Sequence, residues 1–201
     1  MYIPEHFEAG SQHDALTIIE NYNFATLICQ GSEIPEVSLV PLRLAGSNPL
    51  VLEGHLAIKN PMVERVRTGA AVSVIFLGPH AYISPTWYES PGQVPTWNYA
   101  AIEVNGRFEA LESRDQARQV VEDLADKHEH GKRDPWIPDY AESMLDQILG
   151  FRIIAHKVHS KFKLSQNRSR RDLCAVAAEL ESGTPEQNTL ARLMLSSQAR
   201  D

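Results

Sequence analysis

The sequence predicts a mainly β fold with peripheral helices, in which five or six antiparallel strands form a small barrel. The first observation is alternation: Ile102, Val104 and Phe108 are apolar and the residues between them are mostly polar, which indicates a strand with one buried face. Residues 70–77 are nearly all apolar, as expected for a fully buried strand. The connections between the expected strands are short, and parallel strands would need long crossovers, so antiparallel pairing is favoured.

Most of the expected strands lie in the first half of the chain. Asn60-Pro61 marks the start of a short helix that ends near Arg67, because Asn is a favoured N-cap and Pro a favoured first helical residue. Gly78-Pro79 is expected to turn the chain back after the buried strand. The other elements expected here are a helix over 14–22 and strands over 24–30, 36–44, 50–57, 81–84 and 94–111.

The second half is richer in helix. Ala117, Val120 and Leu124 recur at helical spacing behind Ser113, a favoured N-cap, and predict a helix to about His128. Further expected elements are a helix over 140–149, strands over 151–158 and 161–164, and helices over 171–180 and 185–195. We expect a single domain over 1–201, with a barrel over about 23–111 and 151–165, a helical insertion over about 113–149, and C-terminal helices over about 170–196.

Composition narrows the functional classes. The chain has 201 residues, 43% of them hydrophobic, which is enough for a sizeable core. Its formal net charge of -7 argues against nonspecific DNA binding. Cys29 and Cys174 are far apart and fit no ligand spacing, which favours a reducing compartment. No signal peptide and no apolar run long enough for a membrane helix is evident, so we expect a soluble cytoplasmic protein without a membrane partner.

One candidate anion site lies where the third strand leads into the capped helix. His55 and Lys59 stand just ahead of Asn60-Pro61. A helix N-terminus presents free N–H groups and a partial positive charge, and Lys59 would make this end suitable for a phosphate. The alternative is a surface lysine beside an ordinary helix cap, and caps far outnumber phosphate sites.

A second candidate site is aromatic. Trp97, Asn98 and Tyr99 follow a proline at the start of the long strand, and rings with an adjacent amide suit a flat, hydrogen-bonding ligand. The segment from Gly78 to Tyr88, which includes Ser84, is also rich in aromatic and hydroxyl groups. The alternative for this segment is a buried aromatic corner, because aromatic side chains chiefly serve packing.

Residues 151–171 form a basic run without Asp or Glu, which is unusual in an acidic chain. The run is suited to a phosphate, an anionic substrate or a nucleic acid, or it is a solvated strand edge whose lysines discourage pairing. Its segment from Lys163 to Arg168 is dense in hydrogen-bond donors. The histidines lack the ligand count of a metal site, so we expect no metal. No nucleophile elbow, P-loop, dinucleotide fingerprint or helix-turn-helix is evident.

Together these segments resemble a known family. The resemblance is carried, in order, by Met1-Tyr2-Ile3-Pro4 with His6-Phe7, Gly54-His55 with Asn60-Pro61, Gly78-Pro79-His80-Ala81-Tyr82-Ile83-Ser84-Pro85, Val94-Pro95-Thr96-Trp97-Asn98-Tyr99, and Lys163-Leu164-Ser165-Gln166-Asn167-Arg168. The chain is similar to the PaiB-type negative transcriptional regulators, a branch of the FMN-binding split-barrel superfamily that includes pyridoxamine phosphate oxidase. The resemblance implies a six-stranded antiparallel split barrel, a homodimer and FMN at the dimer interface.

The resemblance also implies roles for individual residues. Lys59 and the helix beginning at Asn60 would neutralise the FMN phosphate, and His55 would lie beside the phosphate or the ribityl chain. The isoalloxazine ring would be lined by Trp97, Asn98 and Tyr99, with Thr96 and Ser84 close by. Lys163, Gln166 and Asn167 would approach from the partner subunit or the barrel rim. Two positions depart from the family pattern: Leu39 and Glu103 stand where histidines are common, and no haem, metal or proton-transfer role can rest on them.

Three functions remain open at this stage. The leading one is an FMN-binding regulator that works through a protein partner or a metabolite. The second is a flavin-dependent oxidoreductase, for which the cofactor would carry the electron chemistry and the sequence names no acid or base. The third is a repressor that contacts DNA directly through Arg168, Arg170 and Arg171, and the acidic net charge ranks it last. The sequence leaves open whether the protein is an enzyme.

Overall fold

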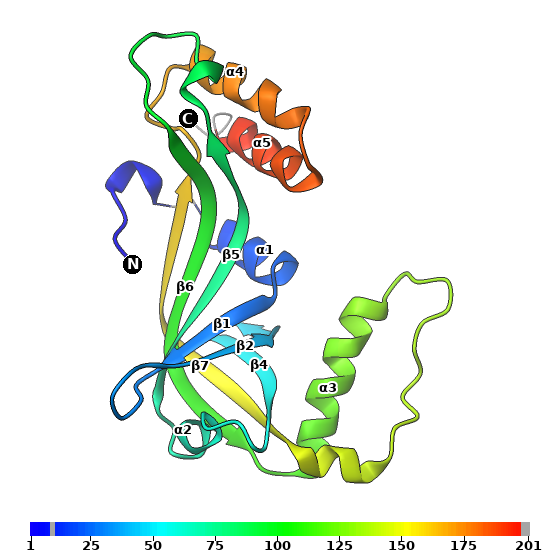
Figure 1. The fold of residues 1–201 in the computed structure, drawn as a ribbon. Helices are drawn as coiled ribbons and strands as arrows, with labels where there is room; N and C mark the ends of the chain where they lie inside the picture. Colours follow the sequence, from blue (N-terminus) through cyan, green and yellow to red (C-terminus); the bar gives the residue numbers. More distant parts are fainter. Residues whose placement is uncertain (9–10, 198–201) are drawn as a thin grey trace. The chain divides into compact units, whose positions relative to one another are not determined.

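A computed structural model describes residues 1–8 and 11–197 of the chain as two compact units. The first unit consists of Met1–Asn21, Leu77–Ile102 and His159–Asp201, and the second of Tyr22–Phe76 and Glu103–Val158. Figure 1 follows the chain through both. Three strands, β5, β6 and β7, contribute residues to each unit, so the units are interleaved in sequence. The predicted division into barrel, insertion and C-terminal helices stays a prediction.

The described residues form a mainly antiparallel β protein with several helices, as the alternation predicted. The strands are β1 (Phe24–Cys29), β2 (Glu36–Pro41), β3 (Arg43–Ser47), β4 (Leu50–Ala57), β5 (Ala71–Ile83), β6 (Thr96–Leu111) and β7 (Ile148–Lys163). The α-helices are α1 (Gln12–Asn21), α2 (Val63–Arg67), α3 (Arg114–Glu129), α4 (Arg170–Glu181) and α5 (Pro185–Ser197). Short 3-10 helices cover Glu5–Phe7, Pro85–Trp87 and Glu142–Gln147.

The predicted count of six strands is wrong, since the described residues hold seven in the order β2-β1-β5-β6-β7-β4-β3. The expected strand over 36–44 is two strands, because the chain changes partners at Leu42. Up to Pro41 it pairs with β1, and from Arg43 onward it pairs with β4. The side chain of Leu42 is fully buried and its N–H bonds to the Asn23 carbonyl at 2.8 Å.

This change of partner shapes the sheet of the second unit. The two edge strands of the hydrogen-bonded order, β2 and β3, are consecutive in sequence and joined only through Leu42. A sheet whose two edges are covalently joined in this way must curl until the edges converge, which is the geometry of a split barrel. Contacts between β2 and β4 agree with this curl. The order itself remains open between β2 and β3 among the described residues.

Three other boundaries differ from the predictions. Gly78-Pro79 does not turn the chain, since β5 runs through both residues. Gly78 permits close packing here, because a Cβ added to it would lie 3.0 Å from Ile18 and 3.2 Å from the Ala100 carbonyl. Pro79 is tolerated because the pairing of β5 with β1 ends at Ile75. The strands expected over 151–158 and 161–164 are one strand, β7. The helix expected over 140–149 is a six-residue 3-10 helix.

Helix α3 follows the apolar stripe that the sequence predicted, since Ala117, Val120 and Leu124 are buried. α3 begins after Ser113, which accepts a hydrogen bond from the Gln116 N–H in a complete capping box, as the sequence indicated. Leu111, Val120 and Leu124 form a buried cluster beneath α3, which packs against β4. In the first unit α4 and α5 lie side by side (Figure 1). Among the described helices none is long and apolar enough to cross a membrane.

Candidate functional site

The first candidate site is an exposed sheet face in the first unit, which we call the aromatic face. Strand alternation places Trp97 and Tyr99 of β6 on this face, with His80 and Tyr82 of β5 and with Lys161 and Lys163 of β7. The Trp97 ring lies 6.2 Å from the Tyr82 ring in an edge-to-face arrangement and 6.3 Å from the His80 ring. Trp97 is 53% exposed and Tyr82 44%, so large ring surfaces are open to solvent.

Two lysines border the rings. The Lys161 ammonium lies 5.5 Å from the centre of the Tyr99 ring, within cation–π range, and donates to the Tyr2 carbonyl at 3.0 Å. Lys163 donates to the Thr96 hydroxyl and, at 2.9 Å, to the Trp97 carbonyl. These partners are neutral, so neither hydrogen bond of Lys163 compensates its charge.

The pKa of Lys163 is correspondingly lowered, first by burial and then by repulsion from Lys161 and Arg168. A nearby anion stabilises the protonated ammonium of such a group, whose charged form is otherwise disfavoured. The aromatic face therefore combines open ring surfaces with an under-compensated cation. This is a combination suited to a planar ligand that carries negative charge.

Asn98 lies on the opposite face of β6 from Trp97 and Tyr99. It is buried, and its amide donates to the Ser165 hydroxyl at 2.8 Å and approaches the Met194 sulfur at 3.4 Å. Its Oδ1 is buried and has no hydrogen-bond partner among the described residues. The structure thus brings Trp97 and Tyr99 together with Lys163, and it turns Asn98 toward the helical side.

The remaining predicted residues of the first unit have local roles. The Gln166 amide accepts from the Leu164 N–H at 2.7 Å and donates to the Phe162 carbonyl at 2.5 Å, which fixes the turn after β7. Asn167 in the same turn is exposed. Ser84 caps the 3-10 helix Pro85–Trp87 through the Thr86 N–H at 3.2 Å. Within the Lys163–Arg168 segment, Lys163 bonds to Thr96 and Trp97 of β6, and Ser165 bonds to Asn98 on the opposite face of that strand.

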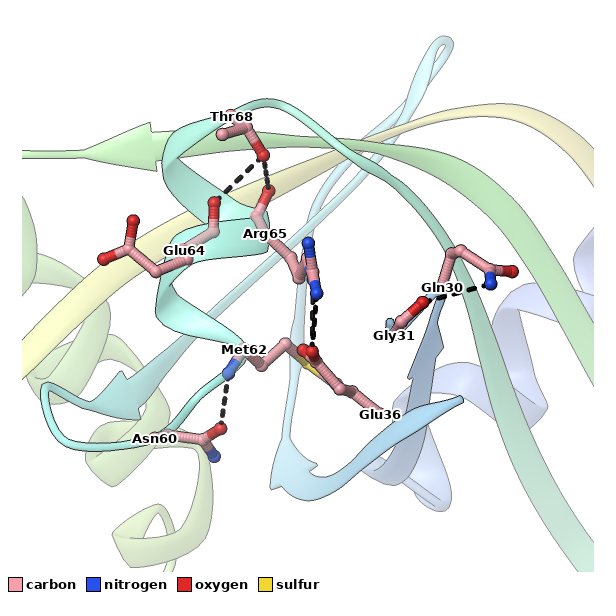
Figure 2. A network of polar contacts seen from close by, with 8 residues as sticks. All are labelled: Gln30, Gly31, Glu36, Asn60, Met62, Glu64, Arg65 and Thr68. Atoms are coloured by element: carbon pink, nitrogen blue, oxygen red, sulfur yellow. Dashed lines mark hydrogen bonds and ion pairs between the residues drawn. The ribbon is translucent and has the colours of Figure 1, made fainter. Parts of the chain in front are cut away.

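The second candidate group lies in the second unit around Asn60 (Figure 2). The Asn60 side chain accepts from the Met62 N–H at 2.9 Å and donates to the Ser38 hydroxyl at 3.0 Å. The predicted helix start at Asn60 is wrong, since α2 begins at Val63 and has only five residues. Asn60 instead closes the turn that precedes α2, so little helix dipole is available at this point.

Lys59 is exposed beside that turn and makes no ion pair among the described residues. The neighbouring cation, Arg65, already forms an ion pair with Glu36, to which it donates through Nε at 3.2 Å and Nη2 at 2.8 Å (Figure 2). Lys59 is therefore the cation of this group that is available to a phosphate. It would act as a mobile point charge, because a lysine on a turn has no fixed fork.

His55 has a different setting from the one expected. Alternation along β4 places it on the face that also carries Val51 and Glu53, and α3 packs against this strand. Its Nδ1 is buried without a partner among the described residues, and burial lowers the pKa of the imidazole. A neutral ring is therefore favoured, and the structure records no contact between His55 and Lys59.

The sequence interpretation left three residues of the aromatic face, His80, Tyr82 and Lys161, out of the ligand candidates. His80 and Tyr82 were noted only within the aromatic segment from Gly78 to Tyr88, with Tyr82 in the strand expected over 81–84, and Lys161 was noted only within the basic run. Alternation was the available signal, because Ala81 separates His80 from Tyr82 and Phe162 separates the two lysines. The basic run itself is divided: Arg152 belongs to the second unit, whereas Arg171 pairs with Glu89 in the first.

Comparisons with known proteins concern the family and the fold. The sequence profile of a family described as "Putative FMN-binding domain" matches residues 1–157. "Protease synthase and sporulation protein PAI 2" of Bacillus subtilis (strain 168) is 31% identical over 201 residues, which cover 96% of each chain. Among solved structures, the FAD and heme binding protein from Mycobacterium smegmatis aligns with a TM-score of 0.62 at 16% identity, over 78% of this chain and 73% of the other. The flavocytochrome Anf3 from Azotobacter vinelandii aligns with a TM-score of 0.60 at 12% identity, over 94% and 78%. At these identities the two structures are evidence for the fold alone, and that fold agrees with a split barrel.

Proposed function

The chain belongs to the FMN-binding domain family that its first 157 residues match, and from this premise we propose that it is a PaiB-like regulator whose flavin ring lies against the aromatic face. The observation that carries this proposal is that the open Trp97 and Tyr82 rings lie on the same face as Lys163, a cation without a carboxylate partner among the described residues. The phosphate role that the resemblance gives to Lys59 is proposed separately, and its support is that Lys59 is exposed and makes no ion pair among the described residues.

The donor set fits the chemistry of the cofactor. The isoalloxazine ring is flat and electron-poor, so the electron-rich rings of Trp97 and Tyr99 suit stacking or edge contacts with it. Lys163 would donate to a ring oxygen, and its positive charge would favour the reduced, more electron-rich flavin. Bound FMN would supply one- and two-electron transfer. Of the other predicted ligands, Thr96 would be reached through Lys163, while Asn98, through Ser165, and Gln166, through the turn after β7, would act as positioning residues.

Titration with FMN tests the proposal directly. We expect quenching of flavin fluorescence with a dissociation constant in the micromolar range or below, and Lys59→Gln should weaken binding about tenfold, or about 1.4 kcal/mol. Lys157→Gln is the matched control, since Lys157 is equally exposed on β7 and belongs to neither candidate group. Absence of binding to FMN at high micromolar concentration, with the fold intact by circular dichroism, would refute the proposal.

We also propose that the protein is a homodimer, as the resemblance implies. The support is an apolar sheet face on β1 and β2, where Phe24, Val37 and Leu39 are each at least 60% exposed. The register places Leu39 opposite Thr26 and Val37 opposite Ile28, so these side chains share one surface. Leu39→Asp should shift the sedimentation coefficient to that of a monomer, whereas Ile34→Asp, in the exposed loop before β2, should not.

For the regulatory role we propose action through a metabolite or a protein partner in the cytoplasm. Cys29 and Cys174 are both free, which agrees with a reducing compartment. Burial together with Glu36 raises the pKa of the Cys29 thiol to about 11, so this thiol is unreactive at neutral pH. Direct DNA binding is the weaker candidate, since Arg171 is paired with Glu89 and Arg168 lies over the Tyr88 ring. Salt-dependent duplex binding that is lost in a triple substitution of Arg168, Arg170 and Arg171 by Gln would overturn this ranking.

The oxidoreductase alternative is separated by turnover. A pure binder leaves NAD(P)H unconsumed in the presence of FMN and a quinone, whereas an enzyme oxidises it catalytically. On the aromatic face, burial and the charges of Lys161 and Arg168 lower the pKa of Lys163, which makes Lys163 the candidate proton donor for such an enzyme.

A further inference from the structure

A cavity lies on the sheet of the second unit and involves none of the residues assigned to FMN above. Its volume is about 300 Å³, and its polar lining consists of Arg43, Glu53, Glu109 and Arg152. Pockets for small molecules start at roughly this size, about 300 Å³. We call it the arginine cavity. Its side chains come from β3, β4, β6 and β7, so it is built on rigid strands.

Glu53 anchors the arginine cavity. Its side chain is only 3% exposed, and each of its two oxygens accepts from a different guanidinium: Oε2 from Arg43 Nη2 and Oε1 from Arg152 Nε, both at 2.5 Å. Strand pairing sets this arrangement, since Glu53 lies opposite Arg43 on β3 and opposite Arg152 on β7. The two guanidinium groups are therefore held in place by a carboxylate whose oxygens are already engaged.

Both arginines keep hydrogen-bond donors that this clasp does not use. Arg43 Nη2 also reaches Asp123 at 2.9 Å, but its Nε is buried and has no hydrogen-bond partner among the described residues. Beyond Glu53, Arg152 has a single approach to a carboxylate, from Nη1 to Glu109 Oε1 at 3.9 Å, which is too long for a hydrogen bond. Because an arginine carries five N–H donors in a fixed fork, these unused edges are oriented binding groups.

Glu109 holds its position loosely. Its side chain is 55% exposed, and an exposed ion pair at that separation contributes little. With Glu53 and Asp123 already matched to the arginines, Glu109 is the carboxylate that can move into water when another acceptor arrives. Ala45, Val51 and Ile154 complete the cavity with an apolar surface. A ligand that fits must therefore join an acceptor group to a short hydrocarbon body.

We propose that the arginine cavity binds a small organic carboxylate with a short aliphatic body. Its carboxylate takes the edge of Arg152 that Glu109 approaches and accepts from the buried Nε of Arg43, while its hydrocarbon lies on Val51 and Ile154. The carboxylate matches the planar fork of a guanidinium, which an isosteric amide does not. This site does not depend on FMN binding, so either proposal can fail while the other stands.

Isobutyrate and isobutyramide, which have the same shape and differ in charge, are the probes. With the full chain labelled by ¹⁵N, isobutyrate at millimolar concentration should shift the Nε–Hε signals of Arg43 and Arg152, and isobutyramide should bind at least tenfold more weakly. Equal affinity for the two compounds overturns the proposal. Inorganic phosphate binding more tightly than isobutyrate also contradicts it, because the apolar body would then contribute nothing.

Two substitutions sharpen the test without removing either arginine. Glu109→Gln should raise the affinity for isobutyrate severalfold, because it removes the competing carboxylate, and Ala45→Leu should abolish binding by filling the cavity. Arg107→Lys is the control, since Arg107 is an exposed arginine that bonds to the Gly69 carbonyl outside the cavity. Unchanged isobutyrate binding in Ala45→Leu, with folding verified by the amide spectrum, would place the ligand elsewhere and refute the proposal.

Discussion

Glu53 in the second unit and Lys163 in the first are both partly or wholly withdrawn from water, yet they are compensated to very different extents. Glu53 has an arginine on each oxygen, whereas the partners of Lys163 in the described part of the chain are a hydroxyl and a carbonyl. A buried charge with matched partners chiefly supports the fold, and removing one partner is costly. A cation with neutral partners has a weakly stabilised charged form, and an incoming anion stabilises that form. The comparison therefore separates a structural charge from a binding charge.

The largest effect should come from breaking the clasp in the second unit. Glu53→Gln leaves two guanidinium groups facing a neutral amide, and we expect a loss of about 3 kcal/mol in the free energy of unfolding, the lower end for a broken buried pair. Urea denaturation followed by circular dichroism measures it. Glu109→Gln, which changes an exposed glutamate on the same cavity, should stay within about 0.5 kcal/mol. Similar losses in both variants would show that Glu53 supports the fold no more than the exposed Glu109 does.

The next effect concerns the rings beside Lys163. Trp97→Ala should weaken FMN binding by about tenfold, or about 1.4 kcal/mol, because it removes the largest exposed ring of the aromatic face. Fluorescence titration gives the dissociation constant. The matched control is Trp136→Ala, since Trp136 is also exposed and stacks on Tyr140 in the second unit, outside both candidate groups. A comparable loss in the control would mean that the titration reports nonspecific stacking.

Lys163 should show a trade between binding and stability. Its folded pKa lies below the ordinary value of 10.5, so the unfolded chain binds the proton more tightly, and the ammonium costs stability at every pH below the folded pKa. That cost disappears as the pH rises through the window between the lowered pKa and 10.5. Lys163→Met should therefore weaken FMN binding at pH 7 while leaving the unfolding free energy equal or higher. A variant that loses both would show that Lys163 is a structural charge.

The smallest effect should come from Asp172, a buried carboxylate in the first unit held by N–H donors instead of cations. It accepts from the N–H groups of Ser90 at 2.9 Å and Glu89 at 3.0 Å, and its pKa is lowered first by the Ser90 bond and further by Ser169. Stability from this group is complete above the ordinary value of 3.8 and is lost as the pH falls through the lowered pKa. Asp172→Asn should flatten the acid limb of the stability curve, measured by denaturation at pH 2–5. An unchanged acid limb would assign that limb to other carboxylates.

Sequence patterns predicted much of the fold, and the aromatic face in part. The alternation of Ile102 and Val104 and the cap at Ser113 both depend on local geometry, and both were confirmed. The turn predicted at Gly78-Pro79 was wrong because the same dipeptide suits both a turn and a closely packed strand. Which of the two forms depends on packing against Ile18, sixty residues earlier. The split at Leu42 was equally hidden, because a strand that changes partners keeps its own alternation.

The sequence by itself determined which residues of each strand share a face, because a period of two follows from backbone geometry alone. It thereby set Trp97 with Tyr99 and Lys161 with Lys163. Only the tertiary structure decided which face of β6 is covered. Helix α5 and the turn after β7 cover the face that carries Asn98, and the rings on the opposite face stay open to solvent. Strand pairing likewise decided that Arg43 and Arg152, more than a hundred residues apart, meet on Glu53. Contacts between distant segments depend on packing energies that no local pattern contains.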